Sequence, residues 1–145
     1  MITRFATYGL LGWSIEILWT GLSTITSGSL NLIGHTSIWM FFVYGSAAIA
    51  FERAYSKISH FNWYVRGIIW TILIFAVEFS SGMLLRLFGI EAWYYNCPLS
   101  ICGVIRLDYA PAWFVVGIMF EKIYSILITK NTGAKQHKKG GSYGQ

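Results

Sequence analysis

The sequence predicts an all-α integral membrane protein with four transmembrane helices. Of its 145 residues, 55% are hydrophobic and 12% are charged, whereas about 25% of the residues in a soluble domain are charged. The mean hydropathy is +0.53. A helix needs about 20 mostly apolar residues to cross the hydrocarbon core of a bilayer. Four segments meet this requirement: residues 5–24, 38–56, 64–88 and 109–129.

The first segment begins near Met1 and could be read as a cleaved signal peptide, but Glu16 interrupts its apolar run. A signal peptide needs an uninterrupted apolar core. We therefore expect this segment to stay as the first span of one transmembrane domain, residues 1–129, which a basic flexible tail follows at residues 130–145.

The positions of Lys and Arg predict the orientation, because short cytoplasmic loops retain positive charge. Nine of the 11 basic residues fall on one side of the predicted bundle: Arg4, Arg53, Lys57, Arg66, Lys122, Lys130, Lys135, Lys138 and Lys139. Both termini are therefore expected in the cytoplasm, with the protein in the cell membrane if its source is bacterial. The lipid bilayer is the expected partner of the basic tail, and no nucleic-acid partner is expected.

Four glutamates interrupt the predicted spans: Glu16, Glu52, Glu78 and Glu121. A charged side chain at the bilayer centre costs about 2.5 to 3.5 kcal/mol on an insertion scale. We expect these carboxyls to turn inward, where they are protonated or paired, with Arg53 or Lys122 as partners. The predicted site for an ion or small solute is Glu16, Glu52, Arg53, Glu78 and Glu121.

The chain also repeats itself. The hexapeptide that begins at Phe51 reappears with four identities at Phe120, and each half has a tryptophan near the start of that span, Trp39 and Trp113. A duplicated helical hairpin explains this pattern. Two hairpins in the same orientation would be related by an axis along the membrane normal, and the four glutamates would then converge.

The neighbours of the glutamates exclude some chemistry. Tyr55 and Tyr124 follow Glu52 and Glu121 by three residues, so they line a polar cavity or belong to an interfacial aromatic belt. A carboxylate-bridged di-metal site would need histidine at such positions. No nucleophile with an adjacent base is visible either. We expect no metal, no cofactor and no catalytic residues.

The connection between the third and fourth spans is unusually apolar. Residues 89–108 contain Trp93, Tyr94 and Tyr95 together with several aliphatic side chains. Such a segment is expected either to fold back over the outer mouth of the bundle or to lie in the membrane interface. Its two cysteines, Cys97 and Cys102, would form a disulfide in an oxidising exterior and stay as thiols otherwise.

Short motifs along residues 4–127 resemble the CmpB-type family, small bacterial membrane proteins labelled putative ABC transporter permeases, with uncharacterised vertebrate relatives. The motifs are Trp13-x-x-Glu16, Gly34 to Trp39, Tyr44-Gly45, Glu52-Arg53, Glu78-Phe79-x-x-Gly82, Trp93-x-Tyr95, and Tyr109 to Trp113 followed by Glu121. The family commonly has an acid where this chain has Tyr94. The resemblance implies a four-span membrane protein and leaves open a separate ATPase subunit.

Nine aromatic residues are expected to support the glutamates, from these motifs and from the tyrosines above: Trp13, Trp39, Tyr44, Tyr55, Trp93, Tyr95, Tyr109, Trp113 and Tyr124. The leading functional hypothesis is a transport component that is oligomeric and whose glutamates line a polar pathway. The alternative is a structural or regulatory membrane protein whose glutamates hold the helices together. A membrane enzyme is the least favoured class.

Overall fold

Four long helices make up most of the protein. The computed structural model describes residues 1–140, with side chains for residues 1–26 and 28–128. The helices are α1 (Ile2–Ser23), α2 (Ile38–Ile58), α3 (Trp63–Leu87) and α4 (Ala110–Gly140). The short elements are the 3₁₀ turns η1 (Thr24–Ser27) and η2 (Leu107–Tyr109) and the strands β1 (Ser100–Ile101) and β2 (Ile105–Arg106). The prediction of an all-α protein is confirmed.

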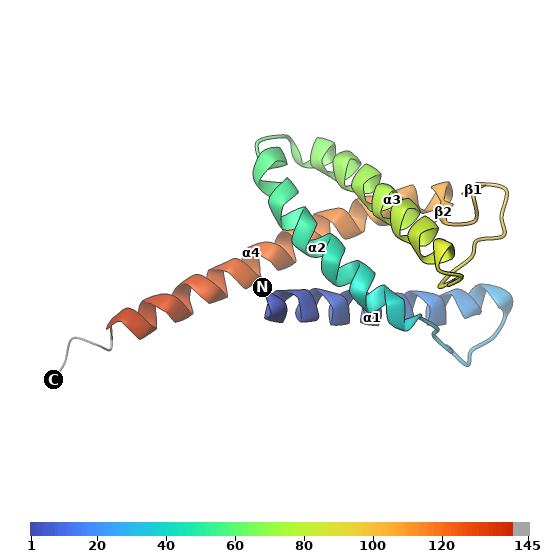
Figure 1. The fold of residues 1–145 in the computed structure, drawn as a ribbon, viewed down its shortest axis with the longest axis horizontal. Coiled ribbons are helices and arrows are strands. Elements are labelled where there is room, and N and C mark those ends of the chain that lie inside the picture. Colours follow the sequence, from blue (N-terminus) through green and yellow to red (C-terminus); the bar gives the residue numbers. More distant parts are fainter. Residues whose placement is uncertain (141–145) are drawn as a thin grey trace.

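The helices pair as two hairpins. α1 packs mainly on α2, and α3 packs mainly on α4, while α2 also contacts both α3 and α4. α4 continues well beyond the other three helices (Figure 1). It passes residue 130, where the sequence predicts the flexible tail to begin, and reaches Gly140. Residues 141–145 of that predicted tail lie outside the described residues.

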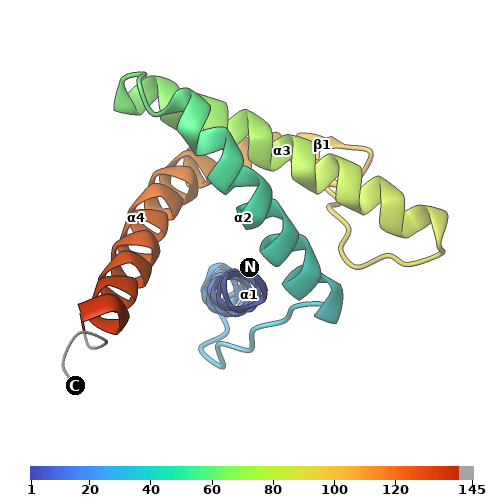
Figure 2. The ribbon, with the colours of Figure 1, turned by 60° about the vertical axis from the view of Figure 1, so that its left-hand side comes forward.

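Two of the predicted spans qualify as membrane-crossing helices in the described part of the chain. They are Trp63–Leu87 and Leu107–Ile128, which are long and apolar enough by length and composition. Figure 2 shows α1 end-on, with α2 crossing beside it. Few of the residues in the most apolar window of either helix are buried within the chain.

The apolar connection before α4 folds back onto α3. The Trp93 indole donates to the Val104 carbonyl over 2.9 Å, and the Tyr95 amide donates to the Gly103 carbonyl over 2.9 Å. Val104 is completely buried, and it packs against Gly82 of α3. Cys97 and Cys102, which lie in the connection between α3 and α4, are both free thiols. The connection therefore covers that end of α3.

Glycine and phenylalanine exchange places between the two hairpins. Gly45 of α2 receives the ring of Phe5 from α1, whereas Gly67 of α3 receives the ring of Phe114 from α4. When α1 is aligned with α3, and α2 with α4, on their glutamates, Phe5 falls on Gly67 and Gly45 falls on Phe114. The same helix-to-helix contact is thus made in both hairpins, with the large and small residues reversed. Small residues at such contacts let helix backbones approach closely.

This exchange predicts a rescue in stability. An added Cβ at Gly45 would lie 2.8 Å from the Phe5 ring, so Gly45→Phe should destabilise the protein by about 1 to 3 kcal/mol through overpacking. Adding Phe5→Gly should recover part of that loss, because the pair then matches Gly67 with Phe114. Thermal unfolding of the purified protein in detergent measures the coupling. Ala50→Phe, at an exposed position of the same helix, is the control; strictly additive losses would contradict the proposed contact.

Candidate functional site: two layers of glutamates

Each long helix carries an aromatic hydrogen-bond donor eight residues before its glutamate. The four pairs are Tyr8 and Glu16, Tyr44 and Glu52, Trp70 and Glu78, and Trp113 and Glu121. Eight residues span about 12 Å along a helix and return to nearly the same face. When two such helices pack antiparallel, the donor of each helix meets the glutamate of the other. This gives one donor–glutamate contact at each end of the helix pair.

The first hairpin has this reciprocal arrangement. The Tyr8 hydroxyl of α1 donates to Glu52 Oε1 of α2 over 2.9 Å. In return, the Tyr44 hydroxyl of α2 donates to Glu16 Oε2 of α1 over 3.0 Å. Glu52 is buried, with 9% of its surface exposed, and Glu16 is half-buried. Both carboxyls are therefore bonded across the α1–α2 contact.

The second hairpin repeats the arrangement with indoles. Trp70 Nε1 of α3 donates to Glu121 Oε1 of α4 over 2.7 Å, and Trp113 Nε1 of α4 donates to Glu78 Oε2 of α3 over 3.1 Å. Glu78 and Glu121 are both buried, and so is Trp70. The donors correspond by position as well, because each lies at the same distance before the glutamate of its own helix. Trp70 is thus the counterpart of Tyr8, and Trp113 is the counterpart of Tyr44.

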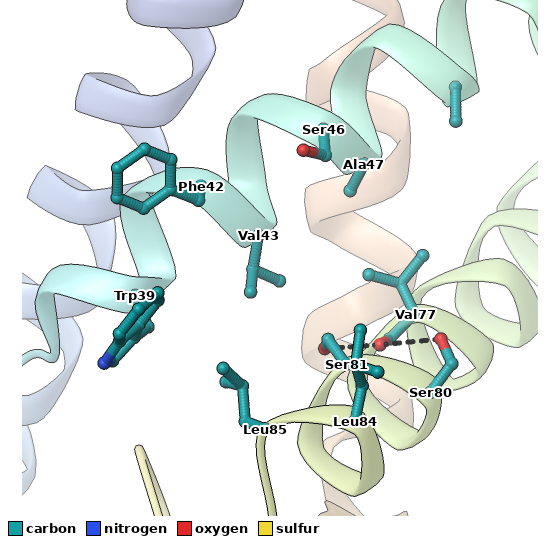
Figure 3. A pocket seen from close by; sticks show the side chains of 11 residues that line it. Trp39, Phe42, Val43, Ser46, Ala47, Val77, Ser80, Ser81, Leu84 and Leu85 are labelled. Atoms are coloured by element: carbon teal, nitrogen blue, oxygen red, sulfur yellow. Dashed lines mark hydrogen bonds between the residues drawn. The ribbon is translucent and has the colours of Figure 1, made fainter. Parts of the chain in front are cut away.

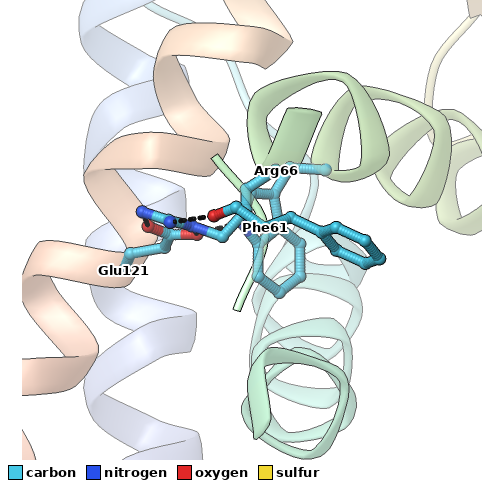
Figure 4. Close-up of polar contacts among 4 residues, drawn as sticks. Phe61, Arg66 and Glu121 are labelled. Carbon is cyan, nitrogen blue, oxygen red and sulfur yellow. Dashed lines mark hydrogen bonds and ion pairs between the residues drawn. The ribbon is translucent and has the colours of Figure 1, made fainter. Parts of the chain in front are cut away.

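Glu52 and Glu121 are also paired with arginines, and we call these four residues the arginine layer. Arg4 Nη1 lies 3.1 Å from Glu52 Oε2. Arg66 bonds Glu121 in a bidentate manner, with Nε 2.8 Å from Oε1 and Nη2 2.9 Å from Oε2, and its Nη1 donates to the Phe61 carbonyl (Figure 4). Bidentate arginine–carboxylate pairs are among the stronger charge-assisted bonds.

The expected partners of these carboxylates were different. The sequence favours Arg53 or Lys122, each directly after a buried glutamate, but both side chains are exposed. Consecutive helical residues do not share a face, so Arg53 points away from the Glu52 carboxyl. The carboxylates are instead paired with arginines of the neighbouring helix, Glu52 with Arg4 and Glu121 with Arg66.

Glu16 and Glu78 make up the second layer, which we call the neutral-donor layer. Glu16 accepts from the Thr36 hydroxyl over 2.9 Å in addition to Tyr44, and Glu78 accepts from Trp113. Among the side chains that the structure describes, no basic group forms an ion pair with either carboxyl. The two carboxyls lie within electrostatic range of each other. The four glutamates are thus divided between two layers instead of meeting at one point.

Tyr95, in the connection between α3 and α4, lies next to the neutral-donor layer. Burial raises the pKa of its phenol well above the ordinary range, and the nearby Glu78, Tyr109 and Glu16 add to the rise. The Tyr95 ring also contacts Tyr109, with centroids 5.8 Å apart, and Tyr109 contacts Trp113 at 6.1 Å. Predicted supporting residues from the connection and from α4 are therefore gathered next to Glu78.

Tyr55 and Tyr124 lie between the hairpins. Their rings contact each other with centroids 5.5 Å apart, and those of Phe51 and Phe120 do so at 5.8 Å. Both pairs join equivalent positions within the repeated hexapeptide, as expected beside a pseudo-two-fold axis. No hydrogen bond in the described part of the chain joins either tyrosine to Glu52 or Glu121.

Three tryptophans that were expected to support the glutamates make other contacts. The Trp13 indole donates to the Ser37 carbonyl over 3.0 Å, and Trp93 holds the outer connection. Trp39 contacts no glutamate among the described side chains. It lines an apolar groove of about 440 Å³ between α2 and α3 (Figure 3). Ser80 and Ser81 also line this groove, but their hydroxyls donate to carbonyls of their own helix. The match of Trp39 with Trp113 is wrong, because the counterpart of Trp113 is Tyr44.

Five residues that bond the four glutamates were not predicted from the sequence as site residues: Arg4, Tyr8, Thr36, Arg66 and Trp70. A signal for four of them exists in the spacing, because Arg4, Tyr8 and Glu16 are spaced along α1 as Arg66, Trp70 and Glu78 are along α3. Within the described residues, no group of three or more His, Cys, Asp or Glu side chains is arranged to hold a metal ion. The layers are thus built from carboxyls and hydrogen-bond donors.

The arginine layer predicts a large and specific loss of stability. Arg66→Gln leaves the buried Glu121 without its bidentate partner, which should cost about 3 to 5 kcal/mol. Arg53→Gln alters an exposed side chain and should change stability by no more than about 0.5 kcal/mol. Denaturant or thermal unfolding in detergent compares the two variants. Equal shifts for Arg66→Gln and Arg53→Gln would contradict this assignment of the ion pair.

Comparison with known proteins agrees with the motifs in the sequence. The family model described as Putative ABC-transporter type IV, which is the CmpB-type family, matches residues 3–141. The matched range contains both layers and all four helices except Ile2, the first residue of α1. No solved structure matches the chain. The protein therefore belongs to the Putative ABC-transporter type IV family.

Proposed function

We propose that this protein is a multi-pass membrane transport component, and that Glu16 and Glu78 form its site for a small solute or ion. The observation that carries the proposal is the absence of an ion-paired base for either carboxyl among the described side chains. A buried carboxylate without a countercharge is costly. Ionisable groups within membrane spans usually serve pathways for ions or substrates.

The proposal includes four spans in two duplicated hairpins. α3 and α4 meet the length and composition of a membrane helix. α1 and α2 place the same kinds of side chain at corresponding positions, including the donor–glutamate pairs and the arginine. A hairpin that makes the same contacts belongs in the same environment. The repeated contacts therefore support equivalent depths for the two hairpins in the bilayer.

The alternative, a structural or regulatory membrane protein, draws its support from the arginine layer. Glu52 and Glu121 are each bonded to an arginine and to an aromatic donor. Satisfied networks of this kind hold helices in one arrangement. We assign the fastening role to this layer and the transport role to the neutral-donor layer, so that the two hypotheses apply to different residues.

The family also implies an ATPase partner, which would be a separate subunit. The connection between α2 and α3 covers only residues 59–62. Contact with such a subunit would therefore involve the helix ends and α4 more than this loop. An oligomer of identical chains is part of the proposal as well.

Replacing the unpaired carboxyls should remove transport. Glu16→Gln and Glu78→Gln should each lower proton or cation flux in reconstituted vesicles by at least about tenfold, because each substitution removes an ionisable group from the proposed pathway. Glu91→Gln, in the outer connection and exposed, is the matched control. Flux that is absent from the wild-type protein, or that ignores both substitutions, would refute the transport role.

The proposed orientation can be tested with the native thiols. Cys102 is exposed in the connection before α4, so a membrane-impermeant maleimide should label it on intact cells, and Cys102→Ser should abolish most of the signal. Lys57→Cys, placed in a background without Cys97 and Cys102, reports the opposite end of the bundle. It should react only after permeabilisation. The reverse labelling pattern would mean that the termini face the exterior.

A further inference from the structure

The groove between α2 and α3 lies within the predicted membrane spans and outside both glutamate layers. It has a volume of about 440 Å³, and its walls are faces of α2 within residues 39–50 and of α3 within residues 77–85 (Figure 3). Two of its lining residues, Ala47 and Val77, also pack against the core cluster around Trp70. One side of the groove is therefore the packed core of the protein.

The walls of the groove offer an occupant almost no polar contacts. None of the described residues that line it is charged. Of its three serines, Ser80 donates to the Ala76 carbonyl over 2.7 Å, and Ser81 donates to the Val77 carbonyl over 2.6 Å. These hydroxyls are therefore satisfied within α3, and an occupant needs neither charge nor hydrogen bonds.

The duplicated half of the chain has large side chains where the groove has small ones. With α1 aligned on α3 and α4 on α2 by their glutamates, the groove residues Ser46, Ala47, Ala50, Ser80 and Ser81 correspond to Val115, Val116, Met119, Leu18 and Trp19, respectively. The Trp19 ring reaches from α1 to Tyr109, just before α4, with centroids 5.8 Å apart. Large apolar side chains of the protein itself are thus present at one of two related places, whereas small residues leave the other open.

The dimensions of the groove decide between a hydrocarbon chain and a helix as the occupant. Residues 39–50 extend about 16 Å along α2. The groove volume then corresponds to a mean cross-section of about 27 Å². A helix is about 10 Å across and needs about 80 Å². Carbon atoms in contact lie about 4 Å apart, so one extended hydrocarbon chain needs roughly 20 Å². The groove therefore fits a single chain and is too narrow for a helix.

The surroundings of the groove supply such a chain. Ser46, Ala50 and Ser80 are exposed, so the groove is open to whatever surrounds the protein. It lies toward the start of α2 and the end of α3, which adjoin the outer leaflet in the proposed orientation. An apolar cavity stays dry and binds apolar molecules. Lipid hydrocarbon is the apolar material at this depth of a bilayer.

We propose that this groove binds one acyl chain of a phospholipid from the outer leaflet, and that the small residues on both walls make room for it. The site requires the protein to lie in the membrane as proposed above. It does not depend on transport by the neutral-donor layer.

Photolabelling in vesicles tests the site. The full-length protein is reconstituted with phosphatidylethanolamine that carries a diazirine near the middle of one acyl chain, and labelled peptides are mapped after irradiation. Label should concentrate in residues 39–50 and 77–85. Ser81→Trp, which copies Trp19, should lose most of this label, whereas Ile72→Trp, at an exposed position of α3 outside the groove, should keep it. Label spread evenly over the exposed helix faces, or unchanged in Ser81→Trp, would overturn the proposal.

A second variant fills the groove from the α2 wall and leaves α3 unchanged. Ser46→Val, Ala47→Val and Ala50→Met together copy the corresponding residues of α4. Added phosphatidylethanolamine should raise the unfolding temperature of the delipidated wild-type protein in detergent, because a ligand of the folded state stabilises it. The triple variant should lose most of this rise, and Ile72→Trp should retain it. An equal rise in all three proteins would contradict the proposed site.

The outcomes for the groove are separate from those for transport. Label in the groove of a protein that shows no flux would refute transport and support the lipid site. Flux without label in the groove would do the opposite. Cross-links that join two chains through residues 39–50 or 77–85 would show that a second copy occupies the groove, which would also overturn the proposal.

Discussion

The structure depends on one interaction, the hydrogen bond from an aromatic side chain of one helix to the glutamate of its antiparallel partner. Removing a carboxyl from water is costly unless donors replace the lost hydration. Here each hairpin makes the bond twice, about 12 Å apart along the helices. Two bonds at separate levels fix both the register of the helices and the face that each presents. Packing of glycine against aromatic rings then follows from the same register.

The two hairpins make equivalent contacts with different side chains. Tyr8 and Tyr44 correspond to Trp70 and Trp113, so hydroxyl donors in one hairpin become indole donors in the other. The Phe5 ring over Gly45 becomes the Phe114 ring over Gly67. Each exchange conserves a donor or a filled volume, which is what close packing requires. The donors to the glutamates therefore differ between the hairpins in kind, hydroxyl in one and indole in the other, but not in position.

The sequence predicts the helices and the buried glutamates, because hydropathy and the cost of an intramembrane charge are properties of single segments. It does not predict the partners by local spacing. Arg53 follows Glu52 directly but projects from another face of the helix, whereas Arg4 reaches Glu52 from a different helix. Tyr55, three residues after Glu52, contacts Tyr124 instead of Glu52. Partners on another helix become visible only through spacings repeated in both halves, such as the equal intervals from Arg4 to Glu16 and from Arg66 to Glu78.

The positions of the two layers explain why only one of them has arginines. Arg4 and Arg66 lie in the first turn of α1 and α3, where a long side chain can keep its charge near water while it bonds a buried carboxylate. Glu16 and Glu78 lie about 12 Å further along the same helices than Tyr8 and Trp70. A cation at that level would lie farther from the helix ends than Arg4 and Arg66 do, and desolvating it there would be costly. Neutral donors leave the charge of the carboxyl free to change, so the layer without arginines is the one in which protonation and transport can be coupled.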